Sequence, residues 1–517
     1  MWDAAHFDEL QQHRIQSMQG GGDDRIAKQH AAGKLTARER IDLLLDEGSF
    51  LEIGAFREAR PLANGEPYST YPGDGVVTGF GKINGRSVCV ASEDFTVNGG
   101  TLGETHSKKI CDIIDAALAA QVPFISINDS GGARIQESVV SLAGYSEIFL
   151  KNVMASGVIP QIAAIMGTCA GGACYSPALC DFVFMTKDCS RMFVTGPSAV
   201  KSATGEIVDF DELGGARVHD RASGVSHFVC EDDAACLSAI RELLNYLPQN
   251  SSSQPEVLSK YSHDRSQELA SIVPDNLSQA YDVHRVIDAI CDEGSFLEVQ
   301  CNFAPNAVVG FSRLQGKVLG IVANQPAQLA GAIDINASDK IARFVRVCDC
   351  FNIPLLTLVD TPGYMPGKMQ EHGGIIRHGA KVLYAYCEAT VPKVTLITRK
   401  AYGGAYIAMN SKRMAADCVF GWPIAQIAVM SADGGVEIVH RKEIASAENP
   451  DELRAELVED YKNRFLNPYF AAKNGLIDEV ILPQETRQKI AQTFDYLAEK
   501  PRRRAFQELR QHGNIPL

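Results

Sequence analysis

Two glycine pairs in this chain stand in the same setting, and each could stabilise negative charge that develops on an oxygen atom. Gly171-Gly172 follows the segment Val158–Ala170, Gly403-Gly404 follows Val391–Tyr402, and alanine comes after each pair. Each copy predicts a buried strand, a tight glycine turn and the start of a helix. Such a turn directs backbone N–H groups, reinforced by the helix dipole, at one point. Two such points in one polypeptide suggest chemistry on two carbonyl groups.

The candidate sites also have plainer interpretations. A glycine pair can serve only the close packing of a helix on a strand, but two equivalent pairs favour a catalytic role. Asp129–Arg134 follows another predicted strand, at the edge where α/β sheets bind ligands. Alternatively, this segment is a capped turn in which Arg134 pairs with Glu137.

A long internal repeat contains both glycine pairs. Asp129 and Gly132 recur as Asp360 and Gly363, each 231 positions later. At the glycine pairs the offset becomes 232, which corresponds to a single insertion. This period is too long for a solenoid repeat, so it indicates duplication of a whole domain.

The elements that position these residues alternate along the chain. Each half predicts strands separated by helices, which gives α/β layers around a mostly parallel sheet. The helical N-terminal region breaks at Gly20–Gly22, and Thr36 with Glu39 predicts a capping box. The two predicted domains are residues 1–255 and 256–517, and the linker is Leu247–Pro255. The predicted strands are 75–80, 86–91, 124–128 and the segment before Gly171 in the first half, and 318–323, 355–359 and 393–398 in the second, with a helix at 105–120.

Composition excludes several classes of protein. A net charge of −14 argues against non-specific nucleic-acid binding, so an anionic ligand needs a local basic patch or backbone amides. The 14 cysteines show no disulfide pattern and the first residues are acidic and polar, which predicts a reducing, cytoplasmic setting.

The uncharged stretch Asn152–Cys180 is long enough to span a bilayer. Its glycines and prolines would leave backbone groups unpaired in lipid, so we expect buried core and no membrane insertion.

Conventional catalytic and metal-binding motifs are missing from the sequence. It contains no nucleophile elbow, no His-Glu-x-x-His, no phosphate-binding loop and no Cys-x-x-Cys pair, so no metal site is predicted. His372 and His378 are expected on a turn or a helix surface. The basic run Lys500–Arg504 is expected to be a solvated surface, with a phosphate contact as the alternative.

Nine segments of the chain carry a resemblance to a known family. They are Gly33–Arg40, Asp94–Val97, Asn128–Gln136, Ser156–Pro160, Cys169–Gly172, Asp334–Asn336, Gly373–Gly379, Arg399–Ala405 and His512–Leu517. With these segments the sequence resembles the carboxyltransferase subunits of biotin-dependent acyl-CoA carboxylases, from about residue 20 to the C-terminus. Within that family, the chain is most similar to the propionyl-CoA carboxylase β chains and the sister methylmalonyl-CoA decarboxylase α chains.

The resemblance implies two crotonase-like domains of ββα superhelix, the first binding acyl-CoA and the second binding carboxybiotin. The amides of Gly171 and Gly172 would hold the enolate oxygen of the thioester, and those of Gly404 and Ala405 the ureido oxygen of biotin. After loss of CO2, the ureido nitrogen would take the α-proton, so no protein base is required. The further binding residues implied are Ser130, Gly131, Gly132, Ala133, Arg134 and Ile407 for acyl-CoA, and Tyr402, Gly403 and Gly363 for biotin.

The same resemblance implies partners. Family enzymes are hexamers, trimers of dimers, whose active sites lie between the N-terminal domain of one subunit and the C-terminal domain of another. Biotin would be carried by a separate biotin carboxyl carrier subunit and loaded by a biotin carboxylase. The chain has no Ala-Met-Lys-Met sequence to bear biotin, so we expect that it cannot act alone.

Three reactions stay open. The favoured one is carboxylation of propionyl-CoA, and of acetyl-CoA, to methylmalonyl-CoA and malonyl-CoA. The alternative is the α subunit of a sodium-pumping methylmalonyl-CoA decarboxylase, because the chemistry is reversible. A biotin-independent hydratase or isomerase of the crotonase type would need one oxyanion hole and an acid/base glutamate, and the second glycine turn would be superfluous.

The sequence departs from the family pattern at three places. Thr168 stands where the family usually has proline, and Ser431–Gly435 replaces a more apolar glycine turn. Ile407 stands where propionyl-CoA carboxylases resemble one another in having aspartate. We expect Ile407 to line the acyl pocket and to admit both acetyl and propionyl groups, unless it only packs the helix that begins at the second glycine pair.

Overall fold

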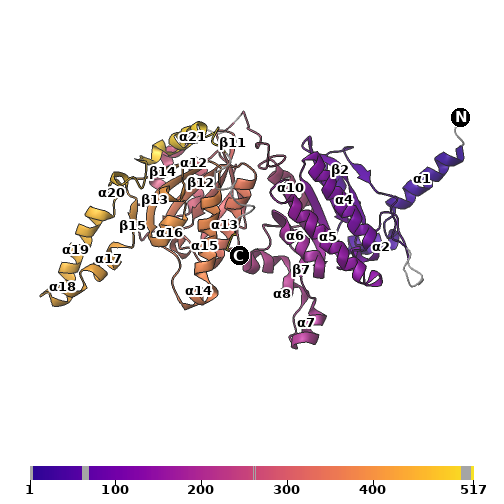
Figure 1. Ribbon diagram of the computed structural model, residues 1–517, viewed down its shortest axis with the longest axis horizontal. Helices are drawn as coiled ribbons and strands as arrows, with labels where there is room; N and C mark the ends of the chain where they lie inside the picture. Colours follow the sequence, from indigo (N-terminus) through magenta and orange to yellow (C-terminus); the bar gives the residue numbers. More distant parts are fainter. Residues whose placement is uncertain (1–3, 61–68, 260, 262–263, 502–513, 517) are drawn as a thin grey trace. The chain divides into compact units, whose positions relative to one another are not determined.

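The computed structural model describes residues 4–60, 69–259, 261, 264–501 and 514–516. The chain forms two compact units, Met1–Gln254 and Pro255–Leu517, coloured indigo to magenta and orange to yellow in Figure 1. Each unit is an α/β structure with its own sheet and hydrophobic core. Most of the basic run at 500–504 and half of the terminal motif at 512–517 lie outside the described residues.

The first sheet has an antiparallel edge and a parallel body. Its strands lie in the order β1, β2, β3, β4, β5, β6, β8, with β7 pairing with the end of β5. The pairs β1–β2 and β2–β3 are antiparallel, whereas the pairs from β3 onward are parallel. The strand bounds are β1 Leu51–Ile53, β2 Val76–Ile83, β3 Arg86–Glu93, β4 Phe124–Ser130, β5 Gln161–Ala170, β6 Phe182–Thr186, β7 Arg191–Phe193 and β8 Phe228–Cys230.

The second sheet repeats this topology. Its order is β16, β14, β13, β12, β11, β10, β9, with β15 pairing with the end of β13. Register shifts occur at matching places, between Asn128 and Ser130 in β4 and between Val359 and Thr361 in β12. The strand bounds are β9 Leu297–Val299, β10 Ala307–Leu314, β11 Lys317–Asn324, β12 Leu355–Thr361, β13 Lys393–Tyr402, β14 Cys418–Gly421, β15 Gln426–Ala428 and β16 Glu479–Val480.

Helices cover the sheets, and α3 begins where the sequence predicts. The capping box is confirmed, since the Thr36 side chain accepts the Glu39 N–H and the Glu39 carboxylate accepts the Thr36 N–H. In the first unit the helices are α1 Ala4–Met18, α2 Asp23–Ala31, α3 Ala37–Leu44, α4 Glu104–Ala120, α5 Val139–Ala155, α6 Tyr175–Leu179, α7 Pro197–Thr204, α8 Phe210–Gly214, α9 Ala216–Val218 and α10 Asp233–Leu244. In the second they are α11 Leu269–Ile272, α12 Val283–Ile290, α13 Ile335–Cys350, α14 Lys368–Gly373, α15 Ile375–Glu388, α16 Gly403–Ala408, α17 Ala432–Val439, α18 Arg441–Ser446, α19 Pro450–Phe465, α20 Pro468–Lys473 and α21 Thr486–Tyr496.

Two buried lysines mark the duplication inside the core. Lys109 on α4 and Lys340 on α13 are both 2 % exposed and stand 231 positions apart. The Lys109 ammonium donates to the Gly73 carbonyl at 2.9 Å, and the Lys340 ammonium donates to the carbonyls of Gln300 and Phe303 at 2.9 Å. Burial lowers the pKa of each to about 8. Each lysine therefore fastens a central helix to the segment that leads into the sheet.

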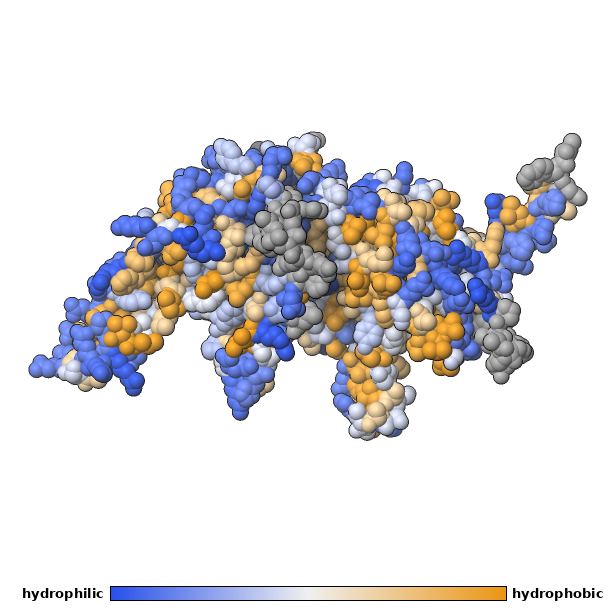
Figure 2. Space-filling view, viewed as in Figure 1, coloured by the Kyte–Doolittle hydropathy of each residue, from blue (hydrophilic) through white to orange (hydrophobic). Residues whose placement is uncertain are grey.

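The long uncharged stretch of the sequence is buried along β5, whereas Val153 and Met154 of α5 and Tyr175 of α6 are exposed. It comprises the end of α5, the buried strand β5, the turn after it and α6. Within the described part of the chain, no helix combines the length and the apolar character needed to cross a membrane. Apolar side chains also gather on the surface of the first unit (Figure 2). The exposed apolar residues of α5 are Val139, Val140, Leu142, Leu150, Val153 and Met154.

Candidate active site

The first glycine turn, Gly171–Ala173, lies at the carboxyl end of β5. Gly171 has φ +64°, a left-handed conformation that favours glycine. The chain then enters a 3-10 turn, Gly171–Cys174, and continues into α6. The Cys174 thiol donates to the Gly171 carbonyl at 2.9 Å. Because the first N–H groups of a helix have no acceptor within it, the amides of Gly171 and Gly172 stand at a point suited to an oxyanion.

The second glycine turn, Gly403–Ala405, repeats this geometry at the carboxyl end of β13. Gly403 has φ +58°, and α16 begins at the same residue. The amides of Gly404 and Ala405 belong to the first turn of that helix, so they too lack an acceptor within it. The two halves of the chain therefore contain the same strand–turn–helix arrangement, each at the end of a central parallel strand.

The packing behind the two turns differs. A Cβ atom on Gly172 would lie 2.9 Å from Cδ2 of the Tyr145 ring, closer than real Cβ contacts allow. A Cβ atom on Gly404 would lie 3.6 Å from Cδ2 of Tyr364, which is ordinary van der Waals contact. The first turn is thus pressed against a buried aromatic ring of α5, whereas the second has room for a methyl group.

The segment Ser130–Ala133 lies next to the first glycine turn. The Ser130 hydroxyl donates to the Gly100 carbonyl at 2.6 Å and accepts the Gly132 N–H at 3.2 Å. Gly132 has φ +99°, and a Cβ atom there would lie 2.8 Å from the carbonyl oxygen of Ala170, the last residue of β5. The structure therefore brings these predicted acyl-CoA residues to the strand end that bears Gly171 and Gly172.

Arg134, directly after the Ser130–Ala133 segment, is buried in ion pairs. Its guanidinium bonds to Asp74 at 2.8 Å, to Glu137 at 2.9 Å and to the Thr101 carbonyl at 2.8 Å, and the residue is 1 % exposed. The alternative interpretation from the sequence, a pair with Glu137, is present in the structure. Contact of Arg134 with acyl-CoA stays a prediction.

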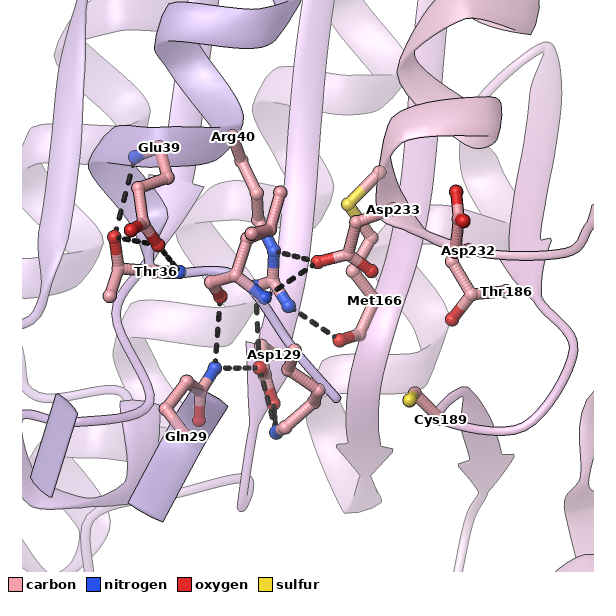
Figure 3. Close-up of polar contacts among 12 residues, drawn as sticks. Gln29, Thr36, Glu39, Arg40, Asp129, Met166, Thr186, Cys189, Asp232 and Asp233 are labelled. Atoms are coloured by element: carbon pink, nitrogen blue, oxygen red, sulfur yellow. Dashed lines mark hydrogen bonds and ion pairs between the residues drawn. The ribbon is translucent and has the colours of Figure 1, made fainter. Parts of the chain in front are cut away.

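A buried ion cluster supports the carboxyl ends of β4 and β5 (Figure 3). Arg40 bonds to Asp129 at 3.3 Å, to Asp233 at 2.8 Å and to the Met166 carbonyl at 2.7 Å. The Lys34 ammonium contacts both carboxylate oxygens of Asp129, at 2.9 and 3.0 Å. Arg40, Asp129 and Asp233 are all buried, so the cluster fastens α3 and α10 to these strand ends.

The second unit has an equivalent buried ion pair, but its cation comes from a different element of the fold. Asp360, the counterpart of Asp129, bonds to the guanidinium of Arg399 at 2.7 Å. Arg399 stands 232 positions after Gly167, the matching place in β5. A Cβ atom on Gly167 would lie 1.9 Å from the Asp129 carboxylate, so glycine at this position leaves room for the carboxylate, and its cation comes from Arg40 instead. Sequence reasoning missed this exchange, although aligning the two halves places Gly167 opposite Arg399.

The predicted biotin residues gather around the second turn. The Tyr402 hydroxyl donates to the Gln426 side chain of β15, and burial raises the pKa of Tyr402 to about 12. Gly363 has φ +142°, and the next residue, Tyr364, packs against Gly404. Ile407 lies on α16 with 47 % of its side chain exposed. Its placement at the surface beside the turn is compatible with either predicted role.

A basic cavity of about 400 Å³ lies beside the Ser130–Ala133 segment. Three cationic side chains, Arg25, Lys28 and Lys34, contribute to its wall, and Lys34 also lies 4.2 Å from the centre of the Phe95 ring. The cavity adjoins the segment through Gly99, whose carbonyl accepts the Gly131 N–H at 2.9 Å. This is the local basic patch that an anionic ligand would need in an acidic chain. This patch was not predicted from the sequence, because Arg25, Lys28 and Lys34 do not form a continuous basic run.

The described residues contain no cluster of three or more histidine, cysteine or acidic side chains that could hold a metal ion. His378, on α15, bonds to Asp339 at 2.8 Å, which agrees with the expected helix-surface role. His372 lies in α14.

Comparison with known proteins finds relatives that match almost the whole chain. The family profile of the carboxyl transferase domain matches residues 28–515. The carboxyltransferase subunit of propionyl-CoA carboxylase from Haloferax mediterranei is 54 % identical over 513 residues, covering 99 % of both chains. The methylmalonyl-CoA decarboxylase subunit alpha of Propionigenium modestum is 50 % identical over 516 residues, again covering 99 % of both. A crystal structure of transcarboxylase 12S, described as a hexamer with methylmalonyl-CoA and methylmalonic acid bound, matches with a TM-score of 0.96 and 51 % identity, covering 100 % of this chain and 99 % of that one.

Proposed function

The chain belongs to the carboxyl transferase family and is an acyl-CoA carboxyltransferase, and on that premise we propose that it moves a carboxyl group from carboxybiotin to the α-carbon of a short-chain acyl-CoA. The biotin is borne by a separate carrier protein. The observation that carries this proposal is the pair of equivalent glycine turns, Gly171–Ala173 and Gly403–Ala405, because carboxyl transfer develops charge on two carbonyl oxygens.

The first glycine turn serves the acyl-CoA. The amides of Gly171 and Gly172 hold the thioester oxygen as the α-proton leaves, and each such donor contributes about 10²–10³ in rate. The Ser130–Ala133 segment provides the adjoining wall. The basic cavity with Arg25 and Lys28 fits the phosphates of coenzyme A, which compensates for the net charge of −14.

The second glycine turn serves the biotin. The amides of Gly404 and Ala405 hold the ureido oxygen, and Tyr402, Gly403 and Gly363 form the surrounding surface. Bound biotin supplies both the carboxyl group and the base that takes the α-proton. This chain therefore needs no catalytic dyad of its own, and its contribution is to orient both substrates and to stabilise charge at two oxygens.

We assign propionyl-CoA as the main substrate and acetyl-CoA as a second one, with Ile407 lining the acyl pocket. The direction in the cell is carboxylation rather than methylmalonyl-CoA decarboxylation. The working assembly is a cytoplasmic homo-hexamer, a trimer of dimers, with biotin carboxylase and carrier subunits as partners. The exposed apolar residues of α5 support subunit contact, since an apolar patch on a soluble surface usually marks an interface.

Purification of the native complex tests these assignments. The proposal predicts that the chain co-purifies with subunits that carry biotin and a biotin carboxylase. The complex should then convert propionyl-CoA to methylmalonyl-CoA with ATP and bicarbonate. Co-purification of membrane-bound subunits together with sodium-dependent decarboxylation would show the decarboxylase instead.

A further inference from the structure

A small cavity lies in the first unit, behind the first glycine turn. Its wall includes Ala173 of the turn itself and Ser176 of α6, so any group inside it touches the back of the candidate oxyanion site. The other polar side chains in its wall are Glu93, Ser126, Asn128 and Tyr145. A polar cavity next to a catalytic turn needs an occupant that satisfies those groups.

The cavity has the size and the chemistry for one water molecule. Its volume is about 20 Å³, and a buried water needs at least roughly 10–15 Å³ with two to four polar partners. The Tyr145 hydroxyl is buried with the Ser130 side chain near it, and it makes no hydrogen bond of ordinary geometry among the described residues. An unsatisfied buried hydroxyl is destabilising, and a bridging water would supply the missing hydrogen bond.

Glu93 is the other main polar group of this cavity. Its carboxyl accepts the Asp129 N–H at 2.9 Å, at the strand end that leads into the Ser130–Ala133 segment. The second carboxyl oxygen lies 3.8 Å from His106 Nε2. Burial, with a further contribution from the Asp129 charge, raises the pKa of Glu93 to about 8. The Asp129 N–H, the Asn128 side chain and the charge of Arg40 lower this pKa. Burial and the nearby cations keep the pKa of His106 well below its ordinary value, so the imidazole is neutral.

The duplicated half provides an independent indication that this position is uncharged. The residue 231 positions after Glu93 is Asn324, and its side-chain oxygen accepts the Asp360 N–H at 3.3 Å. A neutral amide thus performs in the second unit the backbone contact that Glu93 makes in the first. A protonated carboxyl has the same shape as that amide and also offers one O–H to donate.

We propose that uncharged Glu93 and the Tyr145 hydroxyl are bridged by one buried water, and that this network positions the first glycine turn for catalysis. Tyr145 transmits the contact, because its ring lies directly against Gly172. Glu93 and Tyr145 are positioning residues, since neither touches substrate. This role rests on the proposed carboxyltransferase function of the turn.

Four variants of the assembled enzyme test the proposal through kcat, KM and pH profiles. Tyr145→Phe keeps the ring and removes the hydroxyl, and we expect kcat to fall about tenfold with little change in KM for acyl-CoA. Glu93→Leu should lose at least as much, whereas the conservative Glu93→Gln should rescue most of that loss. The wild-type kcat should also decline above about pH 8, and this decline should be absent in Glu93→Gln. Tyr386→Phe is the matched control, since the buried hydroxyl of Tyr386 bonds to Thr357 of β12, in the other sheet, and lines no part of this cavity.

Two structural measurements do not depend on activity. A high-resolution crystal structure should show a water within hydrogen-bond distance of Glu93 and Tyr145. Amide hydrogen exchange of residues 168–176 should be faster in Tyr145→Phe than in Tyr386→Phe. A dry cavity, or unchanged exchange and kcat in both Tyr145→Phe and Glu93→Leu, would overturn the proposal. If the wild-type assembly transfers no carboxyl group, the proposed function fails, while these two measurements still decide whether the network exists.

Discussion

The tight packing behind the first glycine turn gives a sharp prediction for a single methyl group. In Gly172→Ala the new Cβ would meet three atoms of the Tyr145 ring at 2.9, 3.1 and 3.2 Å. Tyr145 is only 4 % exposed, so the ring cannot simply swing into solvent. The turn must therefore move outward, and overpacking of this kind costs about 1–3 kcal/mol.

The catalytic loss should be larger than the loss of stability. Displacing one oxyanion donor costs about 10²–10³ in kcat, so we expect Gly172→Ala to lower kcat by about 10². Gly404→Ala is the matched variant in the second turn, where the methyl group meets the Tyr364 ring at 3.6 and 3.7 Å. Because that contact needs no displacement, its loss of kcat should be at least about tenfold smaller.

The assay is steady-state carboxyl transfer by the reconstituted enzyme, with thermal unfolding as the control for folding. The kcat and KM for acyl-CoA and for the biotin substrate are measured for both variants. Equal kcat for Gly172→Ala and Gly404→Ala, with both proteins folded, would contradict the inferred packing of the first turn.

Four further predictions follow from the sequence and the structure. Native Glu93 keeps its proton up to about pH 8, whereas the unfolded chain releases it above the ordinary pKa of 4.5. The free energy of unfolding should therefore fall by about 1.4 kcal/mol per pH unit as the pH rises toward 8. Denaturant unfolding at pH 6 and 8 should show this slope in the wild type and not in Glu93→Gln. Arg40→Ala should lower the unfolding free energy by about 3–5 kcal/mol, because it leaves the buried Asp233 carboxylate without a cation and Asp129 with Lys34 alone, whereas Arg57→Ala, which breaks a half-exposed pair, should cost less than about 1 kcal/mol. Ile407→Asp should change the ratios of kcat/KM among acetyl-, propionyl- and butyryl-CoA. Each methylene contact contributes about 1–3 kcal/mol to the transition-state binding energy, so the changes should be modest. A streptavidin blot of the purified chain should be blank.

Each of these expectations can fail clearly. A pH slope that persists in Glu93→Gln would show that another group holds the proton. Similar losses for Arg40→Ala and Arg57→Ala would show that the buried cluster contributes no more than a surface pair. Unchanged kcat/KM ratios in Ile407→Asp would leave that residue a packing role, and a biotinylated band would show that the chain carries its own cofactor.

Local sequence predicted the strands and turns because their signals are short in range. The capping box at Thr36 is confirmed, and the predicted segments lie within β3, β4, β11, β12 and β13, while β2 begins one residue later than predicted, at Val76. The helix predicted at 105–120 begins one residue earlier, at Glu104. The glycine turns were predictable because left-handed φ values at Gly171 and Gly403 follow directly from the strand–glycine–helix pattern.

Contacts between distant residues could not be predicted in the same way. Arg40 meets Asp129 and Asp233 across 89 and 193 positions, and no periodicity or spacing encodes that approach. The buried ring of Tyr145 behind Gly172 likewise depends on how α5 packs on the sheet. The internal repeat carried some of this information, since Arg399 stands opposite Gly167 and Asn324 stands opposite Glu93.

The most direct test of the central claim uses the purified chain, methylmalonyl-CoA labelled in its free carboxyl group, and biocytin as a soluble biotin substrate. If the two glycine turns bind acyl-CoA and biotin as proposed, propionyl-CoA should form only when biocytin is present. The label should pass to biocytin before it is released as CO2. This reaction should also be lost in Gly172→Ala. Loss of label without biocytin, or hydration of an enoyl-CoA without any biotin, would contradict the account.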